Sequence, residues 1–116
     1  LRDLDPDHIG AIYDVPNMLR VGIEDSRMGM ELLGSYLAHC HMGNGIPVAG
    51  QQDAQGVLPF QWAFRGLKEG IANVAQIVGD LNAVGFNGHI SLEDFGPGDD
   101  DDKVRVQGAY LRELIG

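Results

Sequence analysis

Three side chains with metal-binding chemistry each stand at the end of a short apolar segment. They are Asp14, His41 and Glu93, and the segments that lead to them are typical of buried strands. If the strands are parallel, their carboxyl ends meet at one edge of the sheet, with neighbours about 4.8 Å apart. Two carboxylates and an imidazole there favour a divalent ion such as Mn²⁺, Mg²⁺ or Co²⁺. The sequence therefore predicts a metal site at these residues.

Each of these side chains also has a purely structural interpretation. Asp14 can cap the turn after its strand, His41 can be a hydrogen-bonded core histidine, and Glu93 can be a solvated loop residue. His39 lies two residues before His41 and therefore shares its face of the strand. It is either an interior structural residue or a contact of the ligand. Cys40 points the opposite way and is interpreted as a buried packing residue.

The elements that must position these residues alternate between strand and helix. Apolar residues at steps of three and four, bounded by capping residues, predict the helices. The strands are expected at residues 9–13, 36–41 and 89–92, the helices at 27–35, 66–84 and 103–115, and a long loop at 42–65. This order is typical of right-handed parallel βαβ units. We therefore predict a single α/β domain over residues 1–116.

Two further residues are candidates for ligand contact. Trp62 lies in the long expected loop, and a loop of this length in a compact domain often covers a pocket. It either forms a wall of the ligand site or anchors the loop. Asn17 follows Pro16 shortly after Asp14, and it either contacts the ligand or belongs to a turn.

Composition and charge disfavour several classes of protein. The 116 residues include 8 basic and 17 acidic side chains, and the net charge of −9 disfavours binding to nucleic acid. The hydrophobic share of 44% is that of a globular domain, and no apolar stretch reaches the ~20 residues that span a bilayer. A single cysteine and the lack of a signal-like segment favour the cytoplasm. The DDDDK run at 99–103 is interpreted as a solvated helix start rather than an engineered tag.

Four segments in order along the chain carry a family resemblance. They read YDVPN at 13–17, YLAHCH at 36–41, GLKEGI at 66–71 and GFNGHISLE at 85–93. They resemble strand-end motifs of the xylose-isomerase-like TIM barrels, a superfamily that includes sugar phosphate isomerases and epimerases. The resemblance implies a partial (βα) barrel of about three parallel βα units, matching the last strands of a TIM barrel. Self-association of two copies is a way to complete it.

The resemblance also implies a chemistry. It makes Asp14, His41 and Glu93 the metal ligands, with Glu93 also the catalytic acid or base that moves a proton through an enediolate. The substrate is then a small sugar or sugar phosphate. The residues expected to contact it are Asn17, His39 and Trp62.

This chain departs from the family pattern in two places. The family's first metal-binding glutamate belongs to a strand before residue 1, and Met42 stands where many members have lysine or asparagine. The expected partner is therefore a missing N-terminal half-barrel or a second copy in a homodimer. An alternative is a non-catalytic, self-associating half-barrel fragment with a partial metal site. A zinc-dependent endonuclease is disfavoured by the few histidines and the negative charge. A hydrolase built on the pair His39 and His41 is disfavoured because such pairs usually belong to a barrel's first strand.

Overall fold

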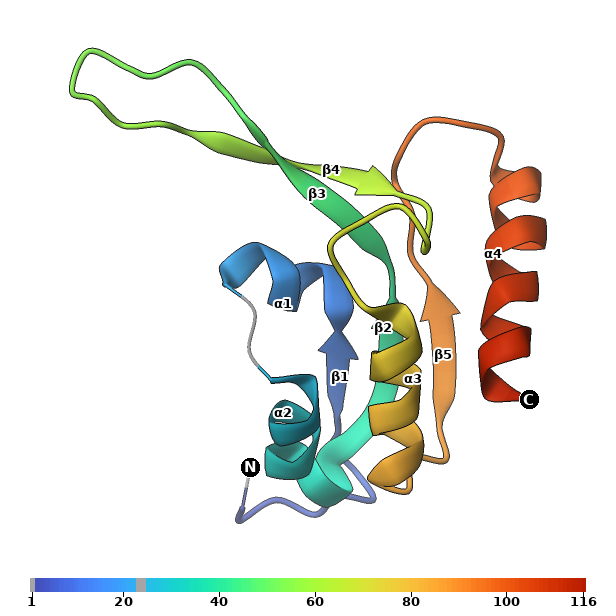
Figure 1. The fold of residues 1–116 in the computed structure, drawn as a ribbon. Coiled ribbons are helices and arrows are strands. Elements are labelled where there is room, and N and C mark those ends of the chain that lie inside the picture. Colours follow the sequence, from blue (N-terminus) through green and yellow to red (C-terminus); the bar gives the residue numbers. More distant parts are fainter. Residues whose placement is uncertain (1, 23–24) are drawn as a thin grey trace.

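Three parallel strands form the sheet that carries the predicted site, in the order β1-β2-β5 (Figure 1). The computed structural model describes residues 2–22 and 25–116. Its strands are β1 (Ala11–Asp14), β2 (Leu37–Met42) and β5 (His89–Leu92). Asp14 pairs with His41, and His41 pairs with Ser91. The expected strands and their parallel direction are confirmed, with each end within two residues of its expected position.

Aspartate and asparagine side chains start the helices. The helices are α1 (Val15–Val21), α2 (Ser26–Leu33), α3 (Val74–Ala83) and α4 (Asp100–Ile115), with a 3₁₀ turn η1 (Gly34–Tyr36). All three expected helices differ from their expected bounds, α2 by only one residue at its start and two at its end. Helix α3 begins late because Asn73 accepts a hydrogen bond from the backbone of Gln76, and α4 begins early because Asp99 caps it. Helix α1 was not expected, because it is short and follows its strand directly.

The segment expected as a loop forms a second sheet instead. Strands β3 (Asn44–Ala49) and β4 (Phe60–Arg65) pair as an antiparallel ribbon, and residues 44–65, here called the arm, project beyond the main sheet (Figure 1). The loop prediction is wrong because Phe60, Trp62 and Phe64 recur at every second residue, which is the period of a strand. Pro47 fits because both strands of a two-stranded ribbon are edges.

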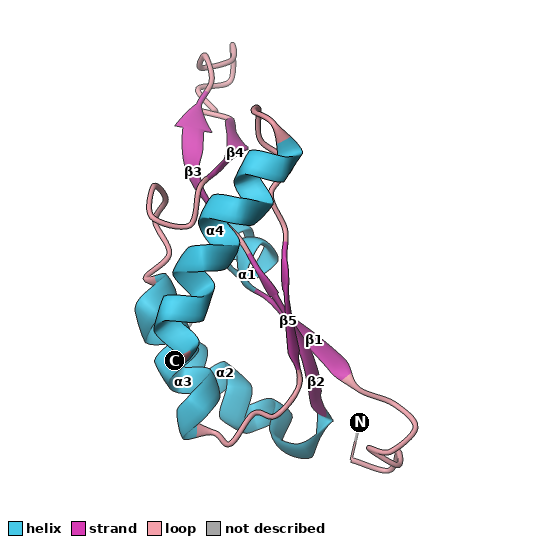
Figure 2. Cartoon of the chain, turned by 90° about the vertical axis from the view of Figure 1, so that its right-hand side faces the viewer, coloured by secondary structure: helices cyan, strands magenta, loops and turns pink. Residues whose placement is uncertain are grey.

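Helices α2, α3 and α4 lie on one face of the parallel sheet (Figure 2). Cys40 and Met42 point into the layer between sheet and helices, where they are fully buried with Met30 of α2. Among the described residues no helix covers the other face of the sheet (Figure 2), and Ile12 is 52% exposed there. The remaining buried core residues are Tyr13, Val15, Leu67, Val74, Ile77, Val78, Leu81 and Leu111. The strand alternation that buries Cys40 turns His39 and His41 toward the open face.

The prediction of a partial (βα) barrel is wrong. Such a barrel needs a helix after every strand, whereas β2 continues into β3 through Gly43 alone. The three-stranded sheet is open, and the arm forms a separate sheet instead of extending it. A half-barrel completed by self-association is excluded by the same finding. The architecture is a mixed α/β domain with a parallel sheet and an antiparallel arm.

Candidate metal centre

The carboxyl ends of the three parallel strands bring Asp14, His41 and Glu93 together. Nδ1 of His41 lies 3.3 Å from Oδ2 of Asp14 and 3.7 Å from Oε1 of Glu93. One ligand atom from each side chain lies within 4.8 Å of the other two. All three side chains are between 20% and 28% exposed, so a solute can reach them although protein covers most of their surface.

Asp14 is held in place by a second role as the N-cap of α1. Its Oδ1 accepts a hydrogen bond from the backbone nitrogen of Asn17 at 2.9 Å, while Oδ2 faces His41. Pro16 in the first turn suits this start, because no N–H is needed there. The two interpretations of Asp14, as a cap and as a ligand, are therefore compatible, since they use different oxygens.

Glu93 reaches the site because the ends of β2 and β5 come close together at Gly43. The backbone nitrogen of Glu93 donates to the carbonyl oxygen of Met42 at 2.9 Å. A Cβ at position 43 would lie 2.4 Å from the carbonyl oxygen of Glu93 and 2.7 Å from Cγ of Pro16. Only glycine fits between these groups, so the turn after β2 can lie against the segments that carry the two carboxylates.

The donor set fits a divalent cation. Metal–ligand distances of about 2.1 Å place adjacent donors of an octahedron about 3 Å apart and opposite donors about 4.2 Å apart. The 3.3 and 3.7 Å separations around His41 lie in this range. A cation would also relieve the repulsion between the carboxylates of Asp14 and Glu93. Three protein ligands leave further positions for water or substrate oxygens, as at catalytic metal sites.

His39 lies one layer deeper on the same face and is not among the three ligands. Its Nε2 lies 2.7 Å from Oγ of Ser91, and its ring stands edge-on to that of His41 with centroids 5.3 Å apart. The register places His89 beside His39. Sequence reasoning missed Ser91, although its position two residues before Glu93 indicates the same face. Below the ligands, the sheet thus offers groups that can hydrogen-bond to hydroxyls.

The structure places the other two expected substrate contacts outside the ligand cluster. Asn17 takes part through its backbone N–H, and its side chain is exposed on α1. Trp62 lies on β4 in the arm, where its ring centroid is 6.4 Å from that of Phe64. Phe64 in turn packs edge-on against Phe95 at 5.3 Å, and Phe95 lies two residues beyond Glu93. A row of rings therefore connects Trp62 to the edge of the site.

A pocket of about 550 Å³ opens beside the ligand cluster. Its lining includes His41, Ser91, Glu93, Phe95 and Lys103. The side chain of Lys103 is only 14% exposed, and its Nζ donates to the carbonyl oxygen of Gly96 and to Asp100. Sequence reasoning treated Lys103 only as the end of the acidic run. Side chains in the first turn of a helix point back toward its N-terminus, which is the signal that could have placed Lys103 here.

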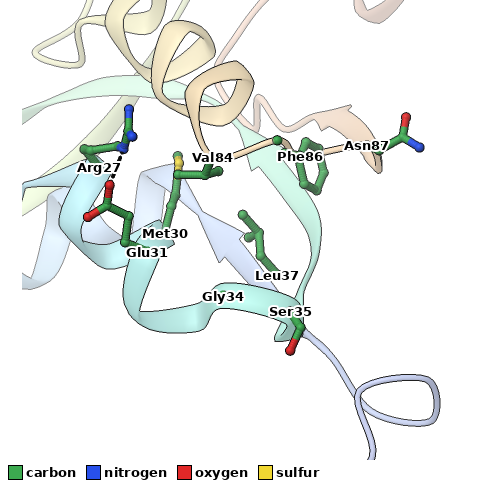
Figure 3. Close-up of a pocket in the computed structure, with 10 residues that line it drawn as sticks. Arg27, Met30, Glu31, Gly34, Ser35, Leu37, Val84, Phe86 and Asn87 are labelled. Carbon is green, nitrogen blue, oxygen red and sulfur yellow. Dashed lines mark hydrogen bonds and ion pairs between the residues drawn. The ribbon is translucent and has the colours of Figure 1, made fainter.

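A second pocket, of about 460 Å³, lies at the opposite end of the sheet (Figure 3). Met30, Leu37 and Phe86 form its apolar floor, and Arg27 and Glu31 form an ion pair of 2.6 Å at its edge. It lies at the amino ends of the strands, because Leu37 begins β2. The metal-ligand group found among the described residues lies at the other end. The candidate metal centre therefore lies at the carboxyl ends of the strands, away from this pocket.

Cys40 stands between the two histidines but takes no part in the site. It is fully buried, and burial raises the pKa of its thiol to about 12, with a further contribution from the negative charge of Asp14. The thiol therefore stays protonated at neutral pH and offers no thiolate to a metal ion. The interpretation of Cys40 as a packing residue agrees with this position.

No family model matches the sequence, and no curated protein is significantly similar to it. The resemblance to the xylose-isomerase-like barrels therefore depends on the four sequence motifs. Within residues 2–22 and 25–116, none of the helices combines the length and apolar character required to cross a membrane.

Proposed function

We propose that this chain carries three ligands of a divalent-metal site at which a small sugar or sugar phosphate is isomerised or epimerised. The observation that carries the proposal is the convergence of Asp14, His41 and Glu93 from three strand ends to within 4.8 Å. The order of the strand-end motifs supports the substrate class. The single, buried cysteine supports a reducing compartment, the cytoplasm, as the place of action.

The side chains divide the work of binding and proton transfer. When bound, a divalent ion supplies Lewis acidity that stabilises negative charge on the carbonyl oxygen of the sugar. Glu93 removes the proton from the carbon next to the carbonyl, and another group returns a proton to the same carbon, from the opposite face, or to the adjacent carbon. Asp14 keeps one oxygen toward the site because its other oxygen is bonded to the backbone of α1.

Other groups in the pocket suit a polyhydroxylated substrate. His39 and Ser91 already share a hydrogen bond and can exchange it for bonds to a sugar hydroxyl. Lys103 uses two of its three N–H donors within the chain, which leaves one for an anionic group such as a sugar phosphate. The edge of the pocket at Phe95 is apolar and suits the C–H face of a sugar.

Metal binding is tested by calorimetric titration of the chain with MnCl₂. We expect one Mn²⁺ per chain, with affinity reduced at least about tenfold in His41→Ala and in Glu93→Gln. Asp101→Asn is the matched control, because it removes one charge from the acidic run. If Asp101→Asn and Glu93→Gln lose the same amount of Mn²⁺ affinity, the acidic run at residues 99–102 binds the ion, and the proposed site is wrong.

Proton transfer is tested by NMR, as metal-dependent incorporation of deuterium from D₂O beside the carbonyl of ketoses and ketose phosphates. We expect exchange with the wild type and a loss of about 100-fold or more in Glu93→Gln. Mn²⁺ binding without exchange on any of these sugars would overturn the catalytic part. It would favour the alternative of a non-catalytic, self-associating chain that keeps a partial metal site.

A further inference from the structure

The chain exposes more surface than a compact monomer of its mass. Its accessible surface is 7636 Å², against about 6,200 Å² for a folded chain of 12.5 kDa. The radius of gyration is 16.0 Å, against about 13 Å for a compact domain of this length. The excess surface of about 1,500 Å² is larger than the ~800 Å² that each partner contributes to a standard protein interface.

The projecting arm accounts for much of this open shape (Figure 1). A two-stranded ribbon is marginally stable in water unless another layer covers it. Within the part of the chain that the structure describes, the two strands of the arm pair with each other alone and form a sheet of their own. The segment that leads from the tip into β4 exposes apolar side chains, since Val57 and Leu58 are each 58% exposed. The arm therefore has the properties of a segment that another surface covers.

One face of the arm carries a row of aromatic side chains. Phe60, Trp62 and Phe64 alternate along β4, so they share that face, and Phe95 extends the row toward the metal-ligand cluster. We call these residues the aromatic row. Its two ends are open to solvent, with Phe60 60% and Phe95 76% exposed. Exposed apolar patches mark interaction surfaces.

The charge distribution indicates where a second copy of this chain can approach. Each copy carries a net charge of −9, so two copies repel one another over most of their surfaces. Residues 44–64 carry a single charged side chain, Asp53, so repulsion is weakest there. Arg20 of α1 lines the same hollow as Phe60 and Trp62, and its positive charge suits a partner with a negative net charge.

We propose that the aromatic row is the interface through which two copies of this chain form a dimer. In a two-fold arrangement the same face serves both copies, so no other macromolecule is required. The interface uses the arm and Phe95, and it leaves the edges of the parallel sheet free. It uses none of the three metal ligands, so dimerisation and Mn²⁺ binding fail independently of each other, although Phe95 belongs both to the row and to the lining of the pocket.

The dimer is tested by light scattering after size exclusion, between about 5 and 200 µM chain. We expect a mass that approaches twice 12.5 kDa as the concentration rises. Phe60→Ser should weaken association by about tenfold or more, because it removes an aromatic contact from the row. Leu32→Ser is the control, since Leu32 is also an exposed apolar residue, 80% exposed, but lies on α2 outside the row.

Trp62 provides a second readout because it is the only tryptophan in the sequence. Its fluorescence should shift to shorter wavelength with increasing concentration in the wild type and in Leu32→Ser, and much less in Phe60→Ser. Higher salt should strengthen association, because it screens the repulsion between two chains of charge −9. A wild type that stays monomeric at 200 µM, or a dimer equally stable in Phe60→Ser, would overturn the proposal.

Discussion

Oδ2 of Asp14 lies 3.3 Å from Nδ1 of His41, while Oδ1 of the same carboxylate accepts a hydrogen bond from the backbone of Asn17. One side chain thus faces the neighbouring strand and also starts the helix that follows its own strand. The two contacts differ in chemistry, since the cap needs an acceptor oxygen and the metal site needs a negative charge. Substitutions at this position should therefore separate folding from metal binding.

Asp14→Asn should bind Mn²⁺ at least about tenfold more weakly while keeping its stability within ~0.5 kcal/mol of wild type, because asparagine caps helices as well as aspartate does. Asp14→Ala should lose the metal affinity and, in addition, about 1 kcal/mol of stability. Urea unfolding and calorimetric titration measure the two effects.

Asp25→Ala is the matched control for this pair. Asp25 caps α2 through the backbone nitrogen of Met28 at 3.0 Å and lies outside the ligand cluster. It should lose about 1 kcal/mol of stability with unchanged Mn²⁺ affinity. If Asp14→Asn instead loses as much stability as Asp14→Ala, the idea that one oxygen of Asp14 caps the helix while the other serves the metal site is wrong.

Gly43→Ala should damage the site although residue 43 has no ligand atom. The added Cβ would meet the backbone of Glu93 and the ring of Pro16, so the strand ends must move apart. We expect a loss of about 1–3 kcal/mol of stability and weaker Mn²⁺ binding. Gly79→Ala on α3 is the control: nothing lies within 4 Å of its Cβ, and a helical alanine should raise stability by up to about 1 kcal/mol. Equal Mn²⁺ affinity in Gly43→Ala and wild type would count against the proposed positioning.

The parallel strands could be predicted from the sequence because each is a short apolar run that ends in a polar residue. The convergence of Asp14, His41 and Glu93 follows from that position, since parallel strands end at one edge. Whether the strands close into a barrel could not be predicted in the same way. Motifs at strand ends are compatible with an open sheet as well as a closed one, because they say nothing about the outer edges of the sheet.

The arm and the wall of the pocket were harder to predict, because the local sequence gives only weak signals for them. Pro47 and the glycines of the arm favour turns, and these signals outweighed the alternating aromatics of β4. Ser91 and Lys103 belong to the pocket because β5 and α4 meet there in three dimensions. The direction in which α4 runs back along the sheet depends on packing rather than on its own sequence.

Asn44 should be among the most sensitive positions of the fold. It is buried at the base of the arm, where Nδ2 donates to the carbonyls of Leu67 and Ala72 and Oδ1 accepts from the backbone nitrogens of Gly45 and Ala72. Asn44→Ala leaves these buried backbone groups unpaired, so we expect a loss of about 3 kcal/mol in urea unfolding.

The exposed Asn87 provides the comparison for Asn44. Asn87→Ala should change stability by less than about 0.5 kcal/mol. A small loss of stability in Asn44→Ala would mean that water takes the place of the side chain and pairs with the backbone groups. It would also mean that the segment from Leu67 to Ala72 is held to the arm by other contacts.

Cys40 reports which way β2 faces. Side chains alternate along a strand, so a buried Cys40 requires that His39 and His41 point to the open face. Burial raises the pKa of the thiol to about 12, so at pH 8 the folded chain holds it protonated, whereas an unfolded chain ionises a substantial fraction. A maleimide should therefore modify Cys40 about 100-fold faster or more in urea than in buffer.

Ala75→Cys in a Cys40→Ala background should react rapidly both in urea and in buffer, because residue 75 is exposed on α3. Rapid modification of wild-type Cys40 in buffer would reverse the orientation of β2 and with it remove His41 from the metal centre.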